Sequence, residues 1–364
     1  MDLTLFLTED CNLRCRYCYH KRSPRVMDGG ALRAALRLGA AEGASTAVSF
    51  YGGEPLLCRE RILEALDFCR RLGRETGRRF TFQTTTNGIL LDEPFLQEAR
   101  KNGLLIALSH DGLAQDENRV AAGGGGTAAL LRETIPLLLR YLPDAPVTMT
   151  VAPGCAGLLA ESVRRFVEED GFRHVIFDPA FGPDILWTEA ALETLAEQYR
   201  LLAERYAAWH RQGRTVRLVP FEAKIDAYIR GEPVCAQTCA MGVRRVSVAA
   251  DGGLYPCIQF VGDPAFRIGD VHTGIDAAAR DRIRRSAGPA PAECRACAFR
   301  DRCRHACGCL NRLTGGSPSR PGGALCAHER LLIRAADALA ERLYREGDRR
   351  FLCRHYARPP QAPS

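Results

Sequence analysis

Short apolar strands alternate with amphipathic helices through roughly the first 180 residues, a pattern typical of stacked βα units around a parallel sheet. The six predicted strands span residues 3–7, 47–51, 80–85, 104–109, 147–151 and 174–177. Helical patterns separate them at residues 31–42, 59–72, 94–102, 128–141 and 158–169. Six units fall short of an eightfold barrel, so we expect an α/β fold built on a partial (β/α)6 TIM barrel. Its reactive loops should follow the carboxyl ends of the strands.

The composition changes sharply at Val234, where cysteines become dense and the predicted elements short. We therefore expect a barrel domain, a connecting helical region, a small cysteine-rich α+β domain, and a final helix with a basic, proline-rich tail, at residues 1–187, 188–233, 234–328 and 329–364. The connecting region begins with a long helix at 188–211, and the final helix spans 327–345. Residues 245–249 and 254–258 predict a β-hairpin, because Asp251-Gly252 suits a tight turn.

Sixteen of the 364 residues are cysteine, and the sequence contains neither a signal peptide nor an apolar run that could span a membrane. We therefore expect a cytoplasmic protein, in which clustered thiols indicate metal or redox chemistry rather than disulfides. The formal charge of +7 favours an anionic partner, but thiolate-held clusters would offset roughly half of it or more. We expect no nucleic-acid partner and no membrane partner.

Cys11, Cys15 and Cys18 follow the first predicted strand with the spacing C-x3-C-x2-C. Such a loop can wrap three thiolates around one point at the carboxyl end of a strand. Three protein ligands leave one metal position open, where a small molecule can bind. An alternative is a zinc site completed by His20.

This spacing, with Tyr17 before the third cysteine, resembles the signature of the radical S-adenosylmethionine (SAM) superfamily. The resemblance extends through the first two thirds of the chain. It implies that the triplet holds a [4Fe-4S] cluster whose open iron chelates SAM. It also implies that one-electron reduction of SAM produces a 5′-deoxyadenosyl radical.

Polar motifs after the next strands resemble the SAM-binding elements of that superfamily. A Gly-Gly-Glu-Pro motif follows the second strand, a Thr-Asn-Gly turn the third, and a Ser-His-Asp-Gly element the fourth. The resemblance implies SAM contacts by Gly52, Gly53, Glu54, Gln83, Asn87, Ser109, Asp111, Arg119 and Tyr17. Glycines allow close backbone approach, and a carboxylate suits the SAM ammonium group. As an alternative, Arg119 and His110 only cap a strand end, and Tyr17 only packs on the barrel.

Eight of the cysteines beyond Val234 form two sets of four, enough for two fully ligated [4Fe-4S] clusters, although Cys-x2-Cys pairs also serve zinc. The array resembles the SPASM domain of sulfatase and ribosomal-peptide maturases over about 234–328. That resemblance implies a first auxiliary cluster on Cys235, Cys239, Cys257 and Cys307, and a second on Cys294, Cys297, Cys303 and Cys326. Cys309 leaves open whether it or Cys307 is the ligand.

Five cysteines have no assigned role, namely Cys58, Cys69, Cys155, Cys309 and Cys353. We expect each to be buried as a small hydrophobic residue. The alternative is that one of them donates a hydrogen atom, as a peptide epimerase of this class requires.

Enzymes with a SPASM domain mostly modify peptides or proteins. Ile258 follows Cys257 where sulfatase-maturating enzymes carry an Asp base, and an alkyl group cannot accept a proton. We therefore expect a radical SAM maturase that crosslinks a ribosomally synthesised precursor peptide through a thioether or carbon–carbon bond. Epimerisation and formylglycine formation stay as alternatives, as does a non-catalytic iron–sulfur or zinc scaffold.

The expected cofactors are three [4Fe-4S] clusters and SAM, and the expected reductant is a flavodoxin or ferredoxin. The chain begins at its first barrel strand, without the N-terminal winged-helix domain by which many relatives bind leader peptides. We therefore expect leader recognition at the barrel mouth or by a separate protein.

Overall fold

All six predicted strands are present in the computed structural model, which describes residues 1–231 and 241–356. They are β1 (Asp2–Thr8), β3 (Ser45–Gly52), β4 (Arg79–Thr86), β5 (Leu104–Ser109), β7 (Val147–Val151) and β8 (His174–Pro179). They lie side by side in this order, and each pair is parallel. The predicted α/β architecture is confirmed.

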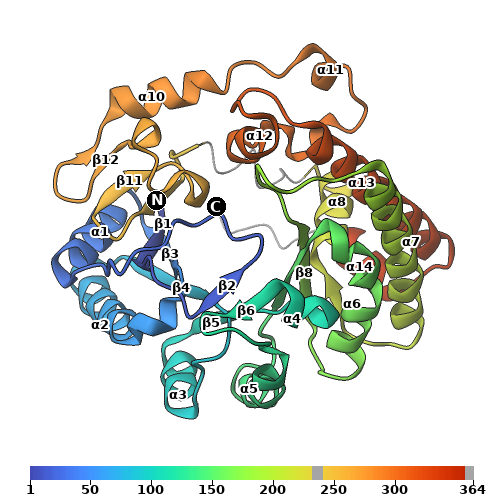
Figure 1. The fold of residues 1–364 in the computed structure, drawn as a ribbon, viewed down its shortest axis with the longest axis horizontal. Coiled ribbons are helices and arrows are strands. Elements are labelled where there is room, and N and C mark those ends of the chain that lie inside the picture. Colours follow the sequence, from blue (N-terminus) through green and yellow to red (C-terminus); the bar gives the residue numbers. More distant parts are fainter. Residues whose placement is uncertain (232–240, 357–364) are drawn as a thin grey trace.

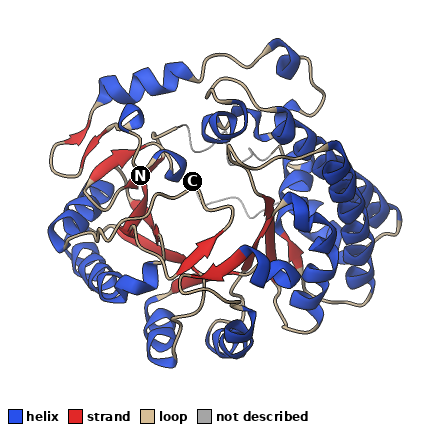
Figure 2. Cartoon of the chain, viewed as in Figure 1, coloured by secondary structure: helices blue, strands red, loops and turns tan. Residues whose placement is uncertain are grey.

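The predicted helices cover the outer face of this curved sheet (Figures 1 and 2). They are α1 (Gly29–Ala41), α2 (Arg59–Thr76), α3 (Glu93–Asn102), α5 (Ala128–Tyr141) and α6 (Leu159–Glu168). Capping residues set their ends: the Asp28 side chain accepts hydrogen bonds at the start of α1, and the Asp92 side chain does so for α3. Val48 and Phe50 of β3 are fully buried, whereas Tyr51 lines a cavity on the inner side. The main apolar core therefore fills the layer between sheet and helices.

The sheet continues into the cysteine-rich region. β10 (Arg245–Val248) pairs in parallel with β1, and β11 (Gly253–Tyr255), β12 (Gly269–Asp270) and β13 (Gly274–Ile275) follow with antiparallel pairing. At the other end, β9 (Arg217–Leu218) pairs with β8. Among the described residues the eleven-stranded sheet therefore ends at β13 and β9, and the barrel is open. The predicted domain limit at Val234 lies outside the described residues.

The predicted hairpin at residues 245–258 is present, with Val248 opposite Leu254, but its second strand ends at Tyr255 rather than at Ile258. Pro256 has no N–H group with which to continue the ladder. Ile258–Phe260 forms a short 3-10 turn instead. In the turn of the hairpin only Gly252 has a positive φ, at 85°, so the glycine alone supplies the left-handed residue.

Helices pack beyond β8 and bridge the open side of the sheet (Figure 1). The long helices α7 (Glu189–Arg211) and α13 (Gly323–Arg345) pack together, joined by α8 (Val219–Ile229) and α14 (Arg349–Tyr356). The segment with α10 (Ala277–Ser286), α11 (Ala292–Arg295) and α12 (Gly308–Gly315) runs from one end of the arc toward the other. None of the helices in the described parts of the chain has the length and apolar character needed to cross a membrane.

Candidate active site

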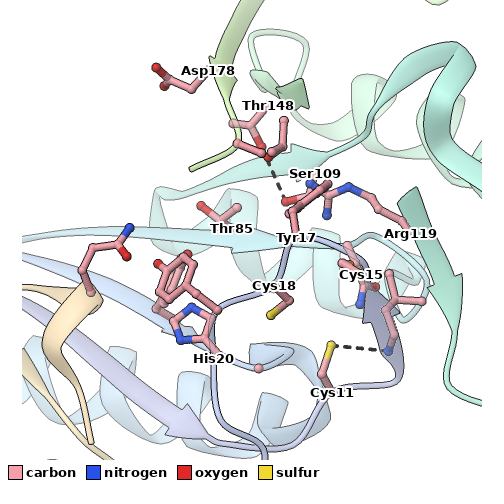
Figure 3. Close-up of a pocket in the computed structure, with 18 of the residues that line it drawn as sticks. Cys11, Cys15, Tyr17, Cys18, His20, Thr85, Ser109, Arg119, Thr148 and Asp178 are labelled. Atoms are coloured by element: carbon pink, nitrogen blue, oxygen red, sulfur yellow. Dashed lines mark hydrogen bonds between the residues drawn. The ribbon is translucent and has the colours of Figure 1, made fainter. Parts of the chain in front are cut away.

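A cavity of about 380 Å³ lies inside the arc, at the carboxyl ends of the parallel strands (Figure 3). The predicted site residues that line it are Cys11, Tyr17, Cys15, Cys18, Gly52, Gly53, Glu54, Asn87, Ser109 and Arg119. The structure therefore gathers residues from separate βα units around one space. Of the predicted SAM contacts, Gln83 and Asp111 do not line it.

The cysteine triplet occupies the loop after β1. Cys15 ends the short strand β2 (Leu13–Cys15), which pairs antiparallel with β6 (Arg119–Ala121), so that Cys15 lies opposite Arg119. The Cys11 thiol accepts a hydrogen bond from the N–H of Leu13 at 3.4 Å (Figure 3). The β2–β6 pairing, which the sequence did not predict, brings Arg119 to the triplet.

The Gly-Gly-Glu-Pro motif hydrogen-bonds to the backbone of this loop. The N–H of Gly53 donates to the carbonyl oxygen of Thr8, and the N–H of Glu54 donates to that of Asp10, both at 2.9 Å. A Cβ atom on Gly53 would lie 1.9 Å from the Asp10 oxygen, so only glycine fits at this position. The close approach that the glycines permit is therefore an approach to the backbone of the cysteine loop.

Glu54 is 1% exposed and ties the motif to β4. Its carboxylate accepts hydrogen bonds from the Leu56 N–H at 3.0 Å, the Thr86 hydroxyl at 2.7 Å and the Asn87 N–H at 2.8 Å. Burial raises the pKa of Glu54. The Asn87 amide donates in turn to Asn12 at 2.7 Å, so the Asn87 side chain holds the cysteine loop directly and that of Glu54 does so through Asn87.

Asp111 is fully buried behind the cavity wall. Its carboxylate accepts hydrogen bonds from Arg119 Nε at 2.9 Å, the Thr150 N–H at 3.1 Å and the Tyr17 hydroxyl at 2.6 Å. The Arg119 guanidinium carbon lies 5.6 Å from the centre of the Tyr17 ring. Asp111 therefore positions three residues that line the cavity, and it holds Arg119 in a buried ion pair.

The remaining predicted positions lie near the strand ends. Gln83 donates from Nε2 to the Ser49 hydroxyl at 2.6 Å, away from the cavity lining. Ser109 lines the cavity, with its hydroxyl 3.5 Å from that of Thr148. His110 is buried, and its Nδ1 accepts the Gly112 N–H at 2.8 Å, which matches the capping alternative.

The donor set of the triplet suits an iron–sulfur cluster, because three soft thiolates with an open position are typical of such ligation. Burial raises the pKa of Cys11 and raises that of Cys15 to about 11. A bound cation would favour their ionised forms.

The zinc alternative fits less well. Among the described residues, no three Cys, His, Asp or Glu side chains converge tightly enough to hold one metal ion. The His20 ring packs against Phe6, Tyr19 and Tyr51, and its buried Nε2 has no hydrogen-bond partner there. A single zinc ion needs all its ligands within about 2.3 Å of the metal. A four-iron cluster has a separate iron for each thiolate and tolerates wider spacing.

The remaining wall of the cavity comes from residues that sequence reasoning missed. Asp178 of β8 pairs with Arg304 at 2.9 Å, and both line the cavity together with Phe181, Gln259, Leu310 and Leu313. Figure 3 shows Asp178 across the cavity from Cys11. Its place at the carboxyl end of a parallel strand is a signal that could have identified it. Arg304 has no comparable sequence signal.

Arg304 belongs to a buried charge network. Its Nε donates to Glu329 at 2.7 Å, and Lys224 donates to the other oxygen of Glu329, also at 2.7 Å. Glu329 and Lys224 are 1% and 4% exposed. Burial by itself raises the pKa of Glu329, but the charges of Arg304 and Lys224 outweigh it and lower that pKa to about 2.

The C-terminal cysteines fall into two groups. The thiol of Cys309 lies close enough to those of Cys257 and Cys307 for both neighbours to raise its pKa. Charge interactions connect the members of the predicted second set, Cys294, Cys297, Cys303 and Cys326. Cys235 and Cys239 lie outside the described residues.

Among the unassigned cysteines, Cys58, Cys69, Cys155 and Cys309 are buried as predicted. Cys353 is exposed, so the prediction of burial is wrong for it. The reason is that α14 turns Phe351 and His355 toward the core and Cys353 outward.

Comparison with known proteins identifies the N-terminal part. Residues 5–168 match the model of the radical SAM superfamily. The chain contains a radical SAM domain. This matched range holds the cysteine triplet and every predicted SAM contact.

The chain is homologous to anaerobic sulfatase-maturating enzymes. It is 25% identical over 283 residues to the cysteine-type enzyme of Clostridium perfringens (strain 13 / Type A), covering 72% of this chain and 74% of that one. It is 26% identical over 336 residues to the serine-type enzyme of Klebsiella aerogenes, covering 84% and 80%.

Solved structures share the fold well beyond the radical SAM domain. Native anSMEcpe with bound AdoMet (SAM) superposes with a TM-score of 0.78 at 18% identity, over 95% of this chain and 99% of that one. Streptococcus suis SuiB bound to S-adenosylmethionine gives a TM-score of 0.61 at 18% identity, over 89% and 76%. The shared fold therefore includes the cysteine-rich region.

Proposed function

We propose that this radical SAM enzyme is a peptide maturase that removes a hydrogen atom from a ribosomally synthesised precursor peptide and forms an intramolecular thioether or carbon–carbon crosslink. One observation carries the proposal: the cysteine triplet and the cysteine-rich C-terminal region line the same cavity. Likeness to anSMEcpe with a bound Cp18Cys peptide and to SuiB bound to the precursor peptide SuiA supports a peptide substrate.

Cys11, Cys15 and Cys18 would hold a [4Fe-4S] cluster in this proposal. Bound there with SAM, the cluster supplies a 5′-deoxyadenosyl radical as the hydrogen-abstracting species. Ser109, Arg119 and Tyr17 line the cavity beside the triplet and would contact SAM, with Arg119 suited to the SAM carboxylate. Glu54, Asn87 and Asp111 would keep the loops in place through the hydrogen bonds described above.

The substrate would occupy the remaining part of the cavity. Phe181, Leu310 and Leu313 offer apolar contact to a side chain. Asp178 adds an acceptor: Arg304 uses Oδ1, and no other described residue bonds to Oδ2. This mixture suits a peptide segment, which presents N–H donors beside side chains.

Formylglycine formation is the second candidate, because homology to sulfatase-maturating enzymes favours it. Against it stands Ile258, which replaces the expected acidic base directly after Cys257. Epimerisation has less support, since none of the five unassigned cysteines lines the cavity where a substrate radical would form.

We further propose that the enzyme carries two auxiliary clusters. Its reductant would be a flavodoxin or ferredoxin, and a separate protein would bind the leader peptide. Sixteen cysteines favour a reducing compartment, so we propose the cytoplasm as its location.

The test begins with anaerobic reconstitution of the full chain with iron and sulfide. We expect dithionite-dependent release of 5′-deoxyadenosine from SAM, and none from a Cys15→Ala variant. Bound zinc in place of iron, with no release from the unchanged chain, would support the scaffold alternative.

The reconstituted enzyme is then incubated with the short peptides encoded beside its gene. A loss of two hydrogen atoms, in a product that does not react with hydrazides, supports a crosslink. Hydrazide reactivity indicates formylglycine instead, and deuterium uptake from solvent without other mass change indicates epimerisation.

A further inference from the structure

A second cavity, of about 370 Å³, adjoins the main one. The residues that line it include Gln259, Phe260, Arg312 and Leu313. Two of these, Gln259 and Leu313, also line the main cavity. The two spaces therefore meet at these two side chains.

The backbone around Gln259 is fixed. Gln259 is the middle residue of the 3-10 turn Ile258–Phe260, in which the N–H of Phe260 donates to the carbonyl oxygen of Cys257 at 3.1 Å. Phe260 is 2% exposed, and its ring stacks on that of Phe266 with 4.0 Å between the ring centres. The turn therefore holds the Gln259 side chain at the boundary between the two cavities.

The Gln259 side chain has an unused acceptor. Its Oε1 atom is buried and receives no hydrogen bond from any described residue. A buried amide oxygen without a partner costs free energy, because water no longer solvates it. Most buried polar atoms do have a partner, so this exception needs a physical reason. A ligand that donates an N–H group to Oε1 would supply the missing hydrogen bond.

The main cavity alone offers little room for both SAM and a peptide. Small-molecule sites occupy roughly 300–1,000 Å³, so the 380 Å³ of the main cavity suit a single molecule of that class. The residues on either side of the reacting one need space beside it. Since successive residues of an extended peptide advance by about 3.3–3.6 Å, a bound peptide crosses into an adjoining cavity within a few residues.

The second cavity has the character of a pocket for an apolar side chain. Phe260 and Leu313 offer apolar contacts. The charge of Arg312 is already paired, because its Nη2 donates to Asp263 at 2.8 Å, and its guanidinium carbon lies 4.6 Å from the centre of the Phe266 ring. The pocket therefore suits an apolar side chain better than an acidic one.

We propose that the two cavities form one substrate channel, in which Gln259 accepts a hydrogen bond from a main-chain N–H of the precursor peptide and the second cavity holds an apolar side chain beside the reacting residue. The inference rests on the proposed function, because it requires a peptide substrate. Every residue except proline carries a main-chain N–H, so Gln259 fixes the path of the peptide without reading its side chains. The apolar pocket supplies the sequence preference.

The experiment measures binding of the short peptides encoded beside the gene to the full, reconstituted chain with SAM, by anaerobic fluorescence anisotropy of labelled peptide. It compares the unchanged protein with Gln259→Leu, which keeps a side chain of similar size but removes the carboxamide. Gln97→Leu is the matched control, because Gln97 is exposed on α3. Each peptide that binds is also prepared with one N-methyl group, placed on each main-chain nitrogen in turn.

We expect Gln259→Leu to weaken binding about tenfold, the usual effect of one hydrogen bond, and Gln97→Leu to leave it unchanged. One N-methyl position should weaken binding to the unchanged protein by a similar factor but should have no such effect on Gln259→Leu. Asp in place of the apolar residue beside that position should weaken binding to both proteins.

Stability gives a readout that separates binding from a structural role. In the cluster-free protein without peptide, Gln259→Leu should not lower the urea concentration at the midpoint of unfolding, because it removes a buried acceptor that has no partner. A side chain that only supported the fold would lower that midpoint when replaced.

Equal affinity of the unchanged protein and Gln259→Leu would overturn the role of Gln259. A lowered midpoint, with every N-methyl position acting alike on both proteins, would overturn it as well. Unchanged affinity after the Asp replacement would overturn the apolar pocket. If no peptide binds the unchanged protein although it releases 5′-deoxyadenosine, the peptide substrate of the proposed function fails and this inference fails with it, and binding to the unchanged protein distinguishes that case from the others.

Discussion

At the scale of single residues, the candidate site depends on buried polar groups that hydrogen-bond to the residues lining the cavity. Asp111 is the clearest case, since three donors from three segments of the chain converge on its carboxylate. Burying a carboxylate costs free energy, and the three hydrogen bonds offset that cost. Removal of Asp111 should therefore disturb the cavity wall as a whole.

Asp111→Asn removes the charge that neutralises the buried Arg119. We expect the free energy of unfolding to fall by roughly 3 kcal/mol, the usual cost of leaving a buried charge without its partner. Urea denaturation of the cluster-free protein measures it. Asp301→Asn is the matched control, because Asp301 is 84% exposed and its ion pair with Arg300 should contribute less than about 1 kcal/mol. Equal effects of the two substitutions would contradict the role given to Asp111.

His110 should make stability depend on pH. Burial lowers its pKa from the ordinary 6.5 to about 4, and its Nδ1 must stay unprotonated to accept the Gly112 N–H. Between these values the unfolded chain binds a proton that the folded chain does not, so stability falls as the pH falls through this range. The full effect is roughly 3 kcal/mol.

The matched variant is His110→Asn, whose Oδ1 can accept the same hydrogen bond without titrating. Urea denaturation between pH 7 and 4 should give it a shallower decline in stability than the unchanged protein. Parallel curves for the two proteins would show that His110 is not responsible.

At the scale of elements, the site is assembled by contacts between loops rather than within them. The turn after β3 hydrogen-bonds to the cysteine loop through the N–H groups of Gly53 and Glu54. At Gly53 the Asp10 carbonyl lies so close that no side chain fits. The cysteine spacing alone therefore does not create the cluster site. It needs this neighbouring turn.

Gly53→Ala should displace the Asp10 carbonyl and with it Cys11. After reconstitution we expect a loss of about four irons per chain, measured by iron analysis, because the triplet no longer presents three thiolates together. Gly123→Ala is the control, since a Cβ atom there meets nothing within 4 Å. Full iron content in Gly53→Ala would mean that the cysteine loop adapts freely.

At the scale of the whole molecule, the cysteine-rich region is a continuation of the barrel sheet. β10 covers one edge of β1, and the network of Lys224, Glu329 and Arg304 joins α8, α13 and the cavity wall. Removal of the cysteine-rich region would therefore leave the β1 edge of the radical SAM domain unpaired. An uncovered, apolar edge strand promotes aggregation.

A chain that ends at Gly231 should consequently not form a stable monomer. It loses β10 from the edge of β1 and α13 from its packing against α7. We expect aggregation in size-exclusion chromatography and little protection of β1 in hydrogen exchange. A chain that ends at Gly347 removes only α14 and the tail and should stay folded. A monomeric, protected 1–231 fragment would contradict this view of the sheet.

The sequence by itself determined the strands, most helices and the cysteine triplet. These features depend on local patterns, namely alternating apolar residues, capping groups and ligand spacing, which act over a few residues. The convergence of Glu54, Asn87 and Ser109 was also predictable, because parallel strands end at the same edge of a sheet.

Only the tertiary structure decided which distant surfaces meet. The pairing of β10 with β1, the pairing of Cys15 with Arg119 and the contact of Asp178 with Arg304 join segments more than a hundred residues apart. Such contacts follow from how whole faces pack and exclude water, which no local pattern encodes. The Cys309 thiol is another example, since the fold brings it close to the thiol of Cys257, which is distant in the sequence.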